Sequence, residues 1–145
     1  MNSELQLLVR LLVAAALAGL LGWERESARK AAGLRTHMLV GIAAALYTSI
    51  GQLSVQDMAA QSENFQADPI RAIQAVAIGI GFLGSGVIFM SRTEDRVYGL
   101  TTAASVWATA AIGIAAGLGH YILAVGATVL LLLVLRGLAR FDKSD

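Results

Sequence analysis

The chain has 145 residues, of which 57% belong to the hydrophobic class and only 14% are charged, whereas an average soluble domain carries about 25% charged residues. This composition argues against a soluble globular domain and indicates an integral membrane protein. The net charge of +1 gives no sign of a nucleic-acid partner, and the absence of cysteine excludes disulfides, thiolate metal sites and cysteine nucleophiles.

Five segments almost free of charge follow one another, and each is expected to cross the bilayer as a helix. Such a helix needs about 20 residues, so the first, third and fourth segments are long enough, while the second and fifth need flanking residues. We expect the first segment to be a membrane helix and not a signal peptide, because no basic region precedes it. The sequence predicts one all-α transmembrane domain, residues 1–145, as a compact bundle of five helices over residues 11–23 (extended back to residue 5 across Arg10), 38–53, 72–90, 100–118 and 121–135.

Basic residues gather on one side of this expected bundle. Nine of the eleven lie in the first and third connections or in the tail: Arg25, Arg29, Lys30, Arg35, Arg92, Arg96, Arg136, Arg140 and Lys143. The second connection is acidic instead, with Asp57, Glu63 and Asp68 against Arg71, and whether residues 54–67 form a loop or a surface helix stays open. Because Lys and Arg favour cytoplasmic loops, we expect the N-terminus outside and the C-terminus inside.

Small residues recur in the first four segments, and the third concentrates them in Gly79, Gly81, Gly84 and Gly86. Lipid gives little hydrophobic force between helices, so small residues that let backbones approach closely become the means of packing. We expect these glycines to form packing ridges. An alternative is that residues 81–86 interrupt the helix and turn carbonyl groups toward an ion, as the broken helices of transporters do.

Polar residues meet at the expected cytoplasmic end of the bundle. Helix one ends in Trp23, Glu24 and Arg25, and helices two and four begin near Arg35, Thr36, Thr101 and Thr102. Glu24 is expected to pair with Arg25 or Arg35, while the threonine hydroxyls cap backbone amides. The alternative is interfacial anchoring, with Trp23 at the headgroup level and the basic residues facing anionic lipid.

The outer end carries a smaller polar set, Arg10, Asp68 and Arg71. Asp68 suits an N-cap, and Pro69 suits the first turn of a helix. Arg10 lies one and a half turns inside helix one, where it either reaches out to the headgroups or points inward and pairs with Asp68.

No ionisable residue lies near the middle of a segment, which weakens the case for a conventional transporter. His37 and His120 fall at opposite ends and form no metal site together. The sequence predicts no catalytic residues, metal or cofactor. The hydroxyls of helix four either bind a small ligand or bond to helix backbones.

Four ordered motifs, "GLLGWERE", "AGLRTHMLVGIAAALY", "DPIRAIQAVAIGIGFLGSGVI" and "GLTTAASVWATAAIGIAAGLG", resemble the membrane domain of the MgtC/SapB family of bacterial inner-membrane proteins. The resemblance implies a multi-pass protein of the bacterial inner membrane, adaptation to low magnesium, survival of pathogens inside host cells, and modulation of other membrane proteins such as an ATP synthase. It also implies that the characteristic positions are Glu24, Arg25, Arg35, Thr36, Asp68, Arg71, the four glycines of helix three, Thr101, Thr102 and Trp107. Many members continue into an ACT-like cytoplasmic domain, and we expect this chain to lack it.

Three functional classes stay open: a non-enzymatic membrane regulator that docks on a partner, a magnesium, cation or small-solute transporter, and a structural subunit. An odd number of helices with small-residue faces also predicts a homodimer. We expect its seam on helix one, along Ala14, Ala18 and Gly22, which follow one another at four-residue spacing.

Overall fold

A computed structural model describes residues 3–61, 68, 70–90 and 98–138. These residues form five helices, α1 (Ser3–Ser27), α2 (Leu34–Gln61), α3 (Ile70–Met90), α4 (Leu100–Gly117) and α5 (Tyr121–Gly137). The first four are long and apolar enough to cross a membrane, whereas α5 has 17 residues and is shorter. The prediction of five helices is confirmed for the all-α fold, and the orientation of the termini stays a prediction.

The second helix is longer than its uncharged segment suggested. It begins at Leu34, continues through Ser54 and ends at Gln61. Most of the stretch after Leu53 is therefore a helical extension. Glu63, in residues 62–67, lies outside the described residues, as do Pro69, Arg92, Arg96, Arg140 and Lys143.

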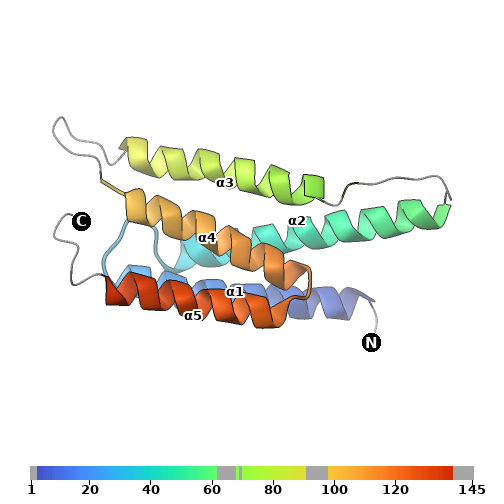
Figure 1. The fold of residues 1–145 in the computed structure, drawn as a ribbon, viewed down its shortest axis with the longest axis horizontal. Coiled ribbons are helices and arrows are strands. Elements are labelled where there is room, and N and C mark those ends of the chain that lie inside the picture. Colours follow the sequence, from blue (N-terminus) through green and yellow to red (C-terminus); the bar gives the residue numbers. More distant parts are fainter. Residues whose placement is uncertain (1–2, 62–67, 69, 91–97, 139–145) are drawn as a thin grey trace.

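The fourth helix occupies the centre of the bundle and contacts each of the other four. Figure 1 shows it between α3 on one side and the pair of α1 and α5 on the other. Its span is far more buried than those of α1, α2 and α3. The core around it consists mainly of alanine, valine and leucine, with Ile112 and Leu21 among its largest fully buried side chains.

Glycines bring α1, α2 and α4 together backbone to backbone. A Cβ atom added to Gly41 would lie 2.6 Å from Ala18 Cβ, and one added to Gly117 would lie 2.6 Å from the carbonyl oxygen of Ala45. A Cβ atom on Gly113 would overlap the carbonyl oxygen of Gly41. Small residues therefore do pack these helices, as the sequence predicts.

The glycines of α3 mostly do not pack, which corrects one prediction. A Cβ atom on Gly79, Gly81 or Gly86 would meet nothing within 4 Å, while one on Gly84 would meet Ala103 of α4 at 3.6 Å. The helix also runs without a break from Ile70 to Met90, so the alternative of an interrupted helix is not what the structure contains. Three of the four glycines therefore permit no close approach between α3 and another helix.

The expected dimer seam on helix one is wrong in its position. Ala14 and Ala18 have no exposed surface, and a Cβ atom on Gly22 would lie 2.7 Å from the Cα atom of Leu34. This row of small residues packs against α2 of the same chain and is not available to a second copy. The homodimer itself stays a prediction.

Candidate functional site

Two polar groups lie inside the bundle, one toward each end. The first, which we call the Glu24 cluster, lies where α1 ends and α2 and α4 begin, and consists of Glu24, Arg25, His37, Thr102, Ser105 and Thr109. The second, the Arg10 cluster, lies where α4 ends, and consists of Arg10, Ser49, Gln52 and Gly117.

The Glu24 cluster contains an ion pair between two consecutive residues. The Nη2 atom of Arg25 donates to Oε1 of Glu24 at 2.8 Å, and Nε of Arg25 donates to the other carboxylate oxygen. Glu24 is 7% exposed and Arg25 is 3% exposed, so both charges have left water. Each oxygen of the carboxylate receives a hydrogen bond from the same guanidinium, which is the bidentate geometry that makes such pairs strong.

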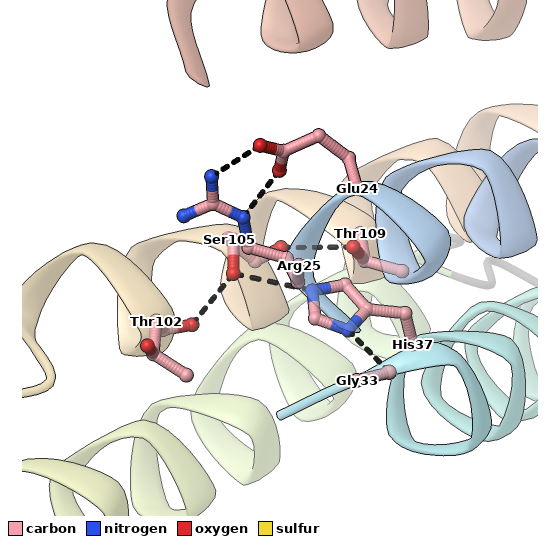
Figure 2. Close-up of polar contacts among 7 residues, drawn as sticks. All are labelled: Glu24, Arg25, Gly33, His37, Thr102, Ser105 and Thr109. Carbon is pink, nitrogen blue, oxygen red and sulfur yellow. Dashed lines mark hydrogen bonds and ion pairs between the residues drawn. The ribbon is translucent and has the colours of Figure 1, made fainter. Parts of the chain in front are cut away.

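His37 links the start of α2 to α4 and has no exposed surface. Its Nδ1 atom lies 2.9 Å from the carbonyl oxygen of Gly33, and its Nε2 atom lies 3.1 Å from Oγ of Ser105. Figure 2 shows the imidazole ring between these two partners. Because a carbonyl oxygen only accepts, Nδ1 carries a proton.

The hydroxyl of Ser105 has two acceptors within reach and one hydrogen to give. It lies 2.8 Å from the carbonyl oxygen of Thr102 as well as beside His37. If the hydroxyl donates to Nε2, the ring is neutral; if it donates to Thr102, Nε2 donates in turn and the ring carries two protons. The state of the ring and the direction of the Ser105 hydroxyl are thus linked.

Three buried threonine hydroxyls bond to the backbone of their own helices. Thr109 Oγ1 donates to the carbonyl oxygen of Ser105 at 2.8 Å, and Thr48 and Thr128 bond in the same way to residues four positions earlier. This is the common behaviour of Ser and Thr in membrane helices. Of the two interpretations of the helix-four hydroxyls, the structure favours backbone bonding over a ligand site.

The predicted inner-end residues separate into buried and exposed groups. Glu24, Arg25 and Thr102 are buried, Thr101 is half-buried, and Arg35 and Thr36 are exposed. Glu24 pairs with Arg25 and not with Arg35. The cap position of α4 is occupied by Gly99, at φ 80°, so no side chain caps the helix from there. Trp23 and Trp107 are exposed, as expected of residues that face lipid or headgroups.

The outer-end prediction is correct for Asp68 and wrong for its pairing with Arg10. Asp68 Oδ1 accepts from the backbone N–H of Ile70 at 3.0 Å and begins α3, while Arg71 is exposed. Arg10 points inward, but its Nη1 atom donates to Oε1 of Gln52 and to the carbonyl oxygen of Gly117, each at 2.8 Å. A carbonyl at the negative end of a helix dipole attracts the guanidinium here.

Sequence reasoning missed Ser49 and Gln52 and gave His37 no partner. Ser49 donates to the same carbonyl of Gly117 as Arg10 does, at 3.1 Å. The signal that could have predicted a buried Ser49 was helical periodicity. Val40, Ala44 and Thr48 follow one another at four-residue spacing on one face of α2 and are buried alongside Ser49. A polar residue at such a position needs a hydrogen-bond partner inside the protein, either in its own helix or across the interface.

Comparison with known proteins places these features in a family. The MgtC family model matches residues 11–144, and the chain belongs to the MgtC family. An uncharacterised protein of Haemophilus influenzae is 42% identical over 127 residues, which cover 88% of this chain and 53% of that protein.

Two further relatives carry names. The Escherichia coli K12 protein named "Putative magnesium transporter YhiD" is 39% identical over 130 residues, 90% of this chain and 59% of the relative. Protein MgtC of Brucella abortus is 38% identical over 118 residues, 81% of this chain and 45% of the relative. The chain therefore spans about half the length of these curated relatives. No solved structure matches it. Fold and family together indicate a multi-pass membrane protein.

Proposed function

We propose that this chain is a non-enzymatic protein of the bacterial inner membrane that supports adaptation to low magnesium by modulating other membrane proteins, with an ATP synthase as the candidate target. Membership of the MgtC family and the magnesium-related name of one relative support the link to magnesium. The arrangement of charges inside the bundle supports a regulator over a transporter.

One observation carries this preference: both carboxylate oxygens of Glu24 are already held by Arg25. Among the described residues, Glu24 is the one buried carboxylate. Magnesium is bound in proteins by oxygen ligands, usually one or two carboxylates with several waters. A carboxylate neutralised by a bidentate guanidinium is a poor ligand for a passing cation.

The rest of the core supports the same proposal. Helices α1, α2 and α4 meet at glycine backbones, which leaves little space for one to move against another. Exposed large side chains instead cover the outer faces of α3 and α5, including Ile78, Phe82 and Phe89 of α3 and Ile122 and Leu130 of α5. A fixed core with broad apolar outer faces suits docking on another membrane protein.

The test is copurification from native membranes. The tagged full chain is isolated with mild detergent from cells grown in limiting and in abundant magnesium, and the membrane proteins that accompany it are identified by mass spectrometry. We expect a defined membrane complex that is enriched in limiting magnesium. A tagged, unrelated membrane protein of similar size serves as the control, and recovery of the chain with the same background proteins as that control would contradict the proposal.

A magnesium transporter is the second candidate, and the printed name of the Escherichia coli relative favours it. Under this alternative Arg25 must release Glu24 during each transport cycle, so that the carboxylate becomes available to the ion. Transport predicts magnesium uptake by vesicles that contain the purified chain alone, and that uptake must depend on Glu24.

A further inference from the structure

The guanidinium of Arg10 lies close to the end of the bundle where α4 turns into α5. Arg10 is seven residues past the start of α1 at Ser3, which places it roughly 10 Å along the helix. Its hydrogen bond to the carbonyl oxygen of Gly117, the last residue of α4, sets it level with the α4–α5 turn.

Only one of its three nitrogens is used within the protein. Both hydrogen bonds of Arg10, to Gln52 and to Gly117, leave from Nη1, and this nitrogen has two hydrogens to donate. Nε and Nη2 donate to none of the residues that the structure describes. These two atoms form the edge with which arginine binds an oxyanion through two parallel hydrogen bonds.

The Nε and Nη2 atoms are not fully buried. Every fully buried side-chain nitrogen or oxygen in the described part of the chain has a hydrogen-bond partner, so the atoms of Arg10 without one retain some exposed surface. Gly119 lies against this side of the guanidinium: a Cβ atom there would lie 3.5 Å from Nη2 and 3.7 Å from Nε. Because glycine has no side chain, Gly119 itself places no side chain over these two nitrogens.

The positive charge is also incompletely balanced. Among the described residues, the partners of Arg10 are a neutral amide and a helix carboxyl end with a partial negative charge. The buried Arg25, in contrast, is paired with the carboxylate of Glu24. A half-buried guanidinium at this depth favours a full anion as its remaining partner.

We infer that Arg10 is a binding site for the phosphate of a membrane phospholipid, with Nε and Nη2 donating to two of its oxygens. Large apolar side chains close to the turn are exposed, with Ile122 at 92% and Leu123 at 63%, so acyl chains have apolar surface beside the site. Because Arg10 lies near one end of a helix long enough to cross the membrane, we expect the phosphates of one leaflet to be within reach of it. The inference holds whether the chain is a regulator or a transporter.

The test measures lipid bound to the purified full chain by native mass spectrometry in detergent. Dioleoyl phosphatidylglycerol is titrated against the wild type, Arg10→Gln and Arg10→Lys. We expect one tightly retained phosphatidylglycerol in the wild type and a loss of affinity of at least about tenfold in Arg10→Gln. Arg10→Lys should bind with intermediate affinity, because lysine keeps the charge but lacks the two-pronged edge.

Controls separate lipid binding from loss of structure. Ser85→Ala removes an exposed hydroxyl that bonds within α3 and leaves the guanidinium and its partners intact, so it should keep the wild-type affinity. Arg71→Gln removes an exposed arginine at the same end of the bundle and should also bind normally. If Arg10→Gln does not fold, as judged by its helical circular dichroism, the phosphatidylglycerol affinity of Arg10→Lys is compared with that of the wild type instead.

Three results would overturn the inference. The first is equal phosphatidylglycerol affinity in the wild type and the folded Arg10 variants. The second is an equal loss in Arg71→Gln. The third is displacement of the lipid by inorganic phosphate at millimolar concentration, because a soluble anion would then account for the binding. Retention of dioleoylglycerol as tight as that of phosphatidylglycerol would count in the same way, because the acyl chains alone would then account for the binding.

Discussion

Glu24 and Arg25 are the two buried charged side chains in the described part of the chain, and neither has another charged partner there. Removal of one member of a buried pair leaves the other charge desolvated and uncompensated. The stability of the bundle therefore depends on the pair more than on any exposed charge.

The first prediction follows from this dependence. Glu24→Gln should lower the free energy of unfolding by about 3 kcal/mol or more, because Arg25 stays buried without a counter-charge. The measurement is reversible unfolding in mixed micelles, followed by circular dichroism. Arg35→Gln, at an exposed position of α2, should change the value by less than about 0.5 kcal/mol, and equal losses in the two variants would refute a special role for the pair.

The second prediction compares two serines. Ser105→Ala removes the partner of His37 Nε2 and should destabilise the protein by about 1–3 kcal/mol, because a buried ring nitrogen loses its hydrogen bond. Ser85→Ala is the matched control, since its hydroxyl is exposed and bonds within its own helix to the carbonyl oxygen of Phe82. The same unfolding measurement checks both variants, and a larger loss in Ser85→Ala would be incompatible with the Glu24 cluster as described.

How far the sequence predicts the site differs among these residues. The pairing of Glu24 with Arg25 and the cap at Asp68 follow from local sequence, because both interactions join residues one or two positions apart. The bonds from His37 to Ser105 and from Arg10 to Gly117 join residues 68 and 107 positions apart. They depend on helix rotation and register, which an apolar segment without strong periodicity does not specify.

At the scale of helices, glycine has two different uses in this chain. Gly113 of α4 permits the closest approach between α4 and α2, where an added Cβ atom would overlap backbone. Gly79 and Gly86 of α3 have open space around them. Composition alone treats these positions alike, so the prediction of packing ridges on α3 is correct for Gly84 and wrong for Gly79, Gly81 and Gly86.

The third prediction tests this difference with one type of substitution. Gly113→Ala should destabilise the bundle by about 2 kcal/mol or more, because the methyl group forces α2 and α4 apart. Gly79→Ala should leave stability unchanged or raise it by up to about 1 kcal/mol, because alanine favours helix and meets no neighbour. Thermal melting of both variants in one detergent gives the comparison, and a destabilising Gly79→Ala would mean that α3 packs on this face.

The helix count and the type of every element follow from hydropathy and length, but the ends do not. The second helix extends to Gln61 although its apolar segment stops at Leu53, because polar residues such as Ser54 and Gln56 are compatible with a helix that leaves the hydrocarbon. Hydropathy indicates which part of a helix is covered by lipid. The end of a helix is set by its backbone hydrogen bonds, which can continue beyond the apolar part.

At the scale of the whole molecule, the distribution of Lys and Arg predicts the orientation. The fourth prediction uses the absence of native cysteine: single cysteines replace Ala31, between α1 and α2, and Ala60, near the end of α2. A membrane-impermeant maleimide added to intact cells should label Ala60→Cys and spare Ala31→Cys until the membrane is opened. Labelling of both residues from the outside would contradict a membrane crossing by α2.

The same experiment decides whether the short fifth helix crosses. Leu138 is the first residue after α5. If α2, α3, α4 and α5 all cross the membrane, Leu138 lies on the same side as Ala31. We expect Leu138→Cys to be protected in intact cells. Labelling of Leu138→Cys together with Ala60→Cys would leave four crossings.

Arg25 neutralises the one carboxylate that is buried among the described residues, and we propose that the chain therefore conducts no cation. Vesicles containing the purified chain and a magnesium-sensitive dye test it most directly, with empty vesicles and vesicles containing Glu24→Gln alongside. We expect all three to show the same uptake under an inward magnesium gradient with a negative interior potential. Magnesium uptake by the wild type that exceeds empty vesicles and disappears in Glu24→Gln would contradict it.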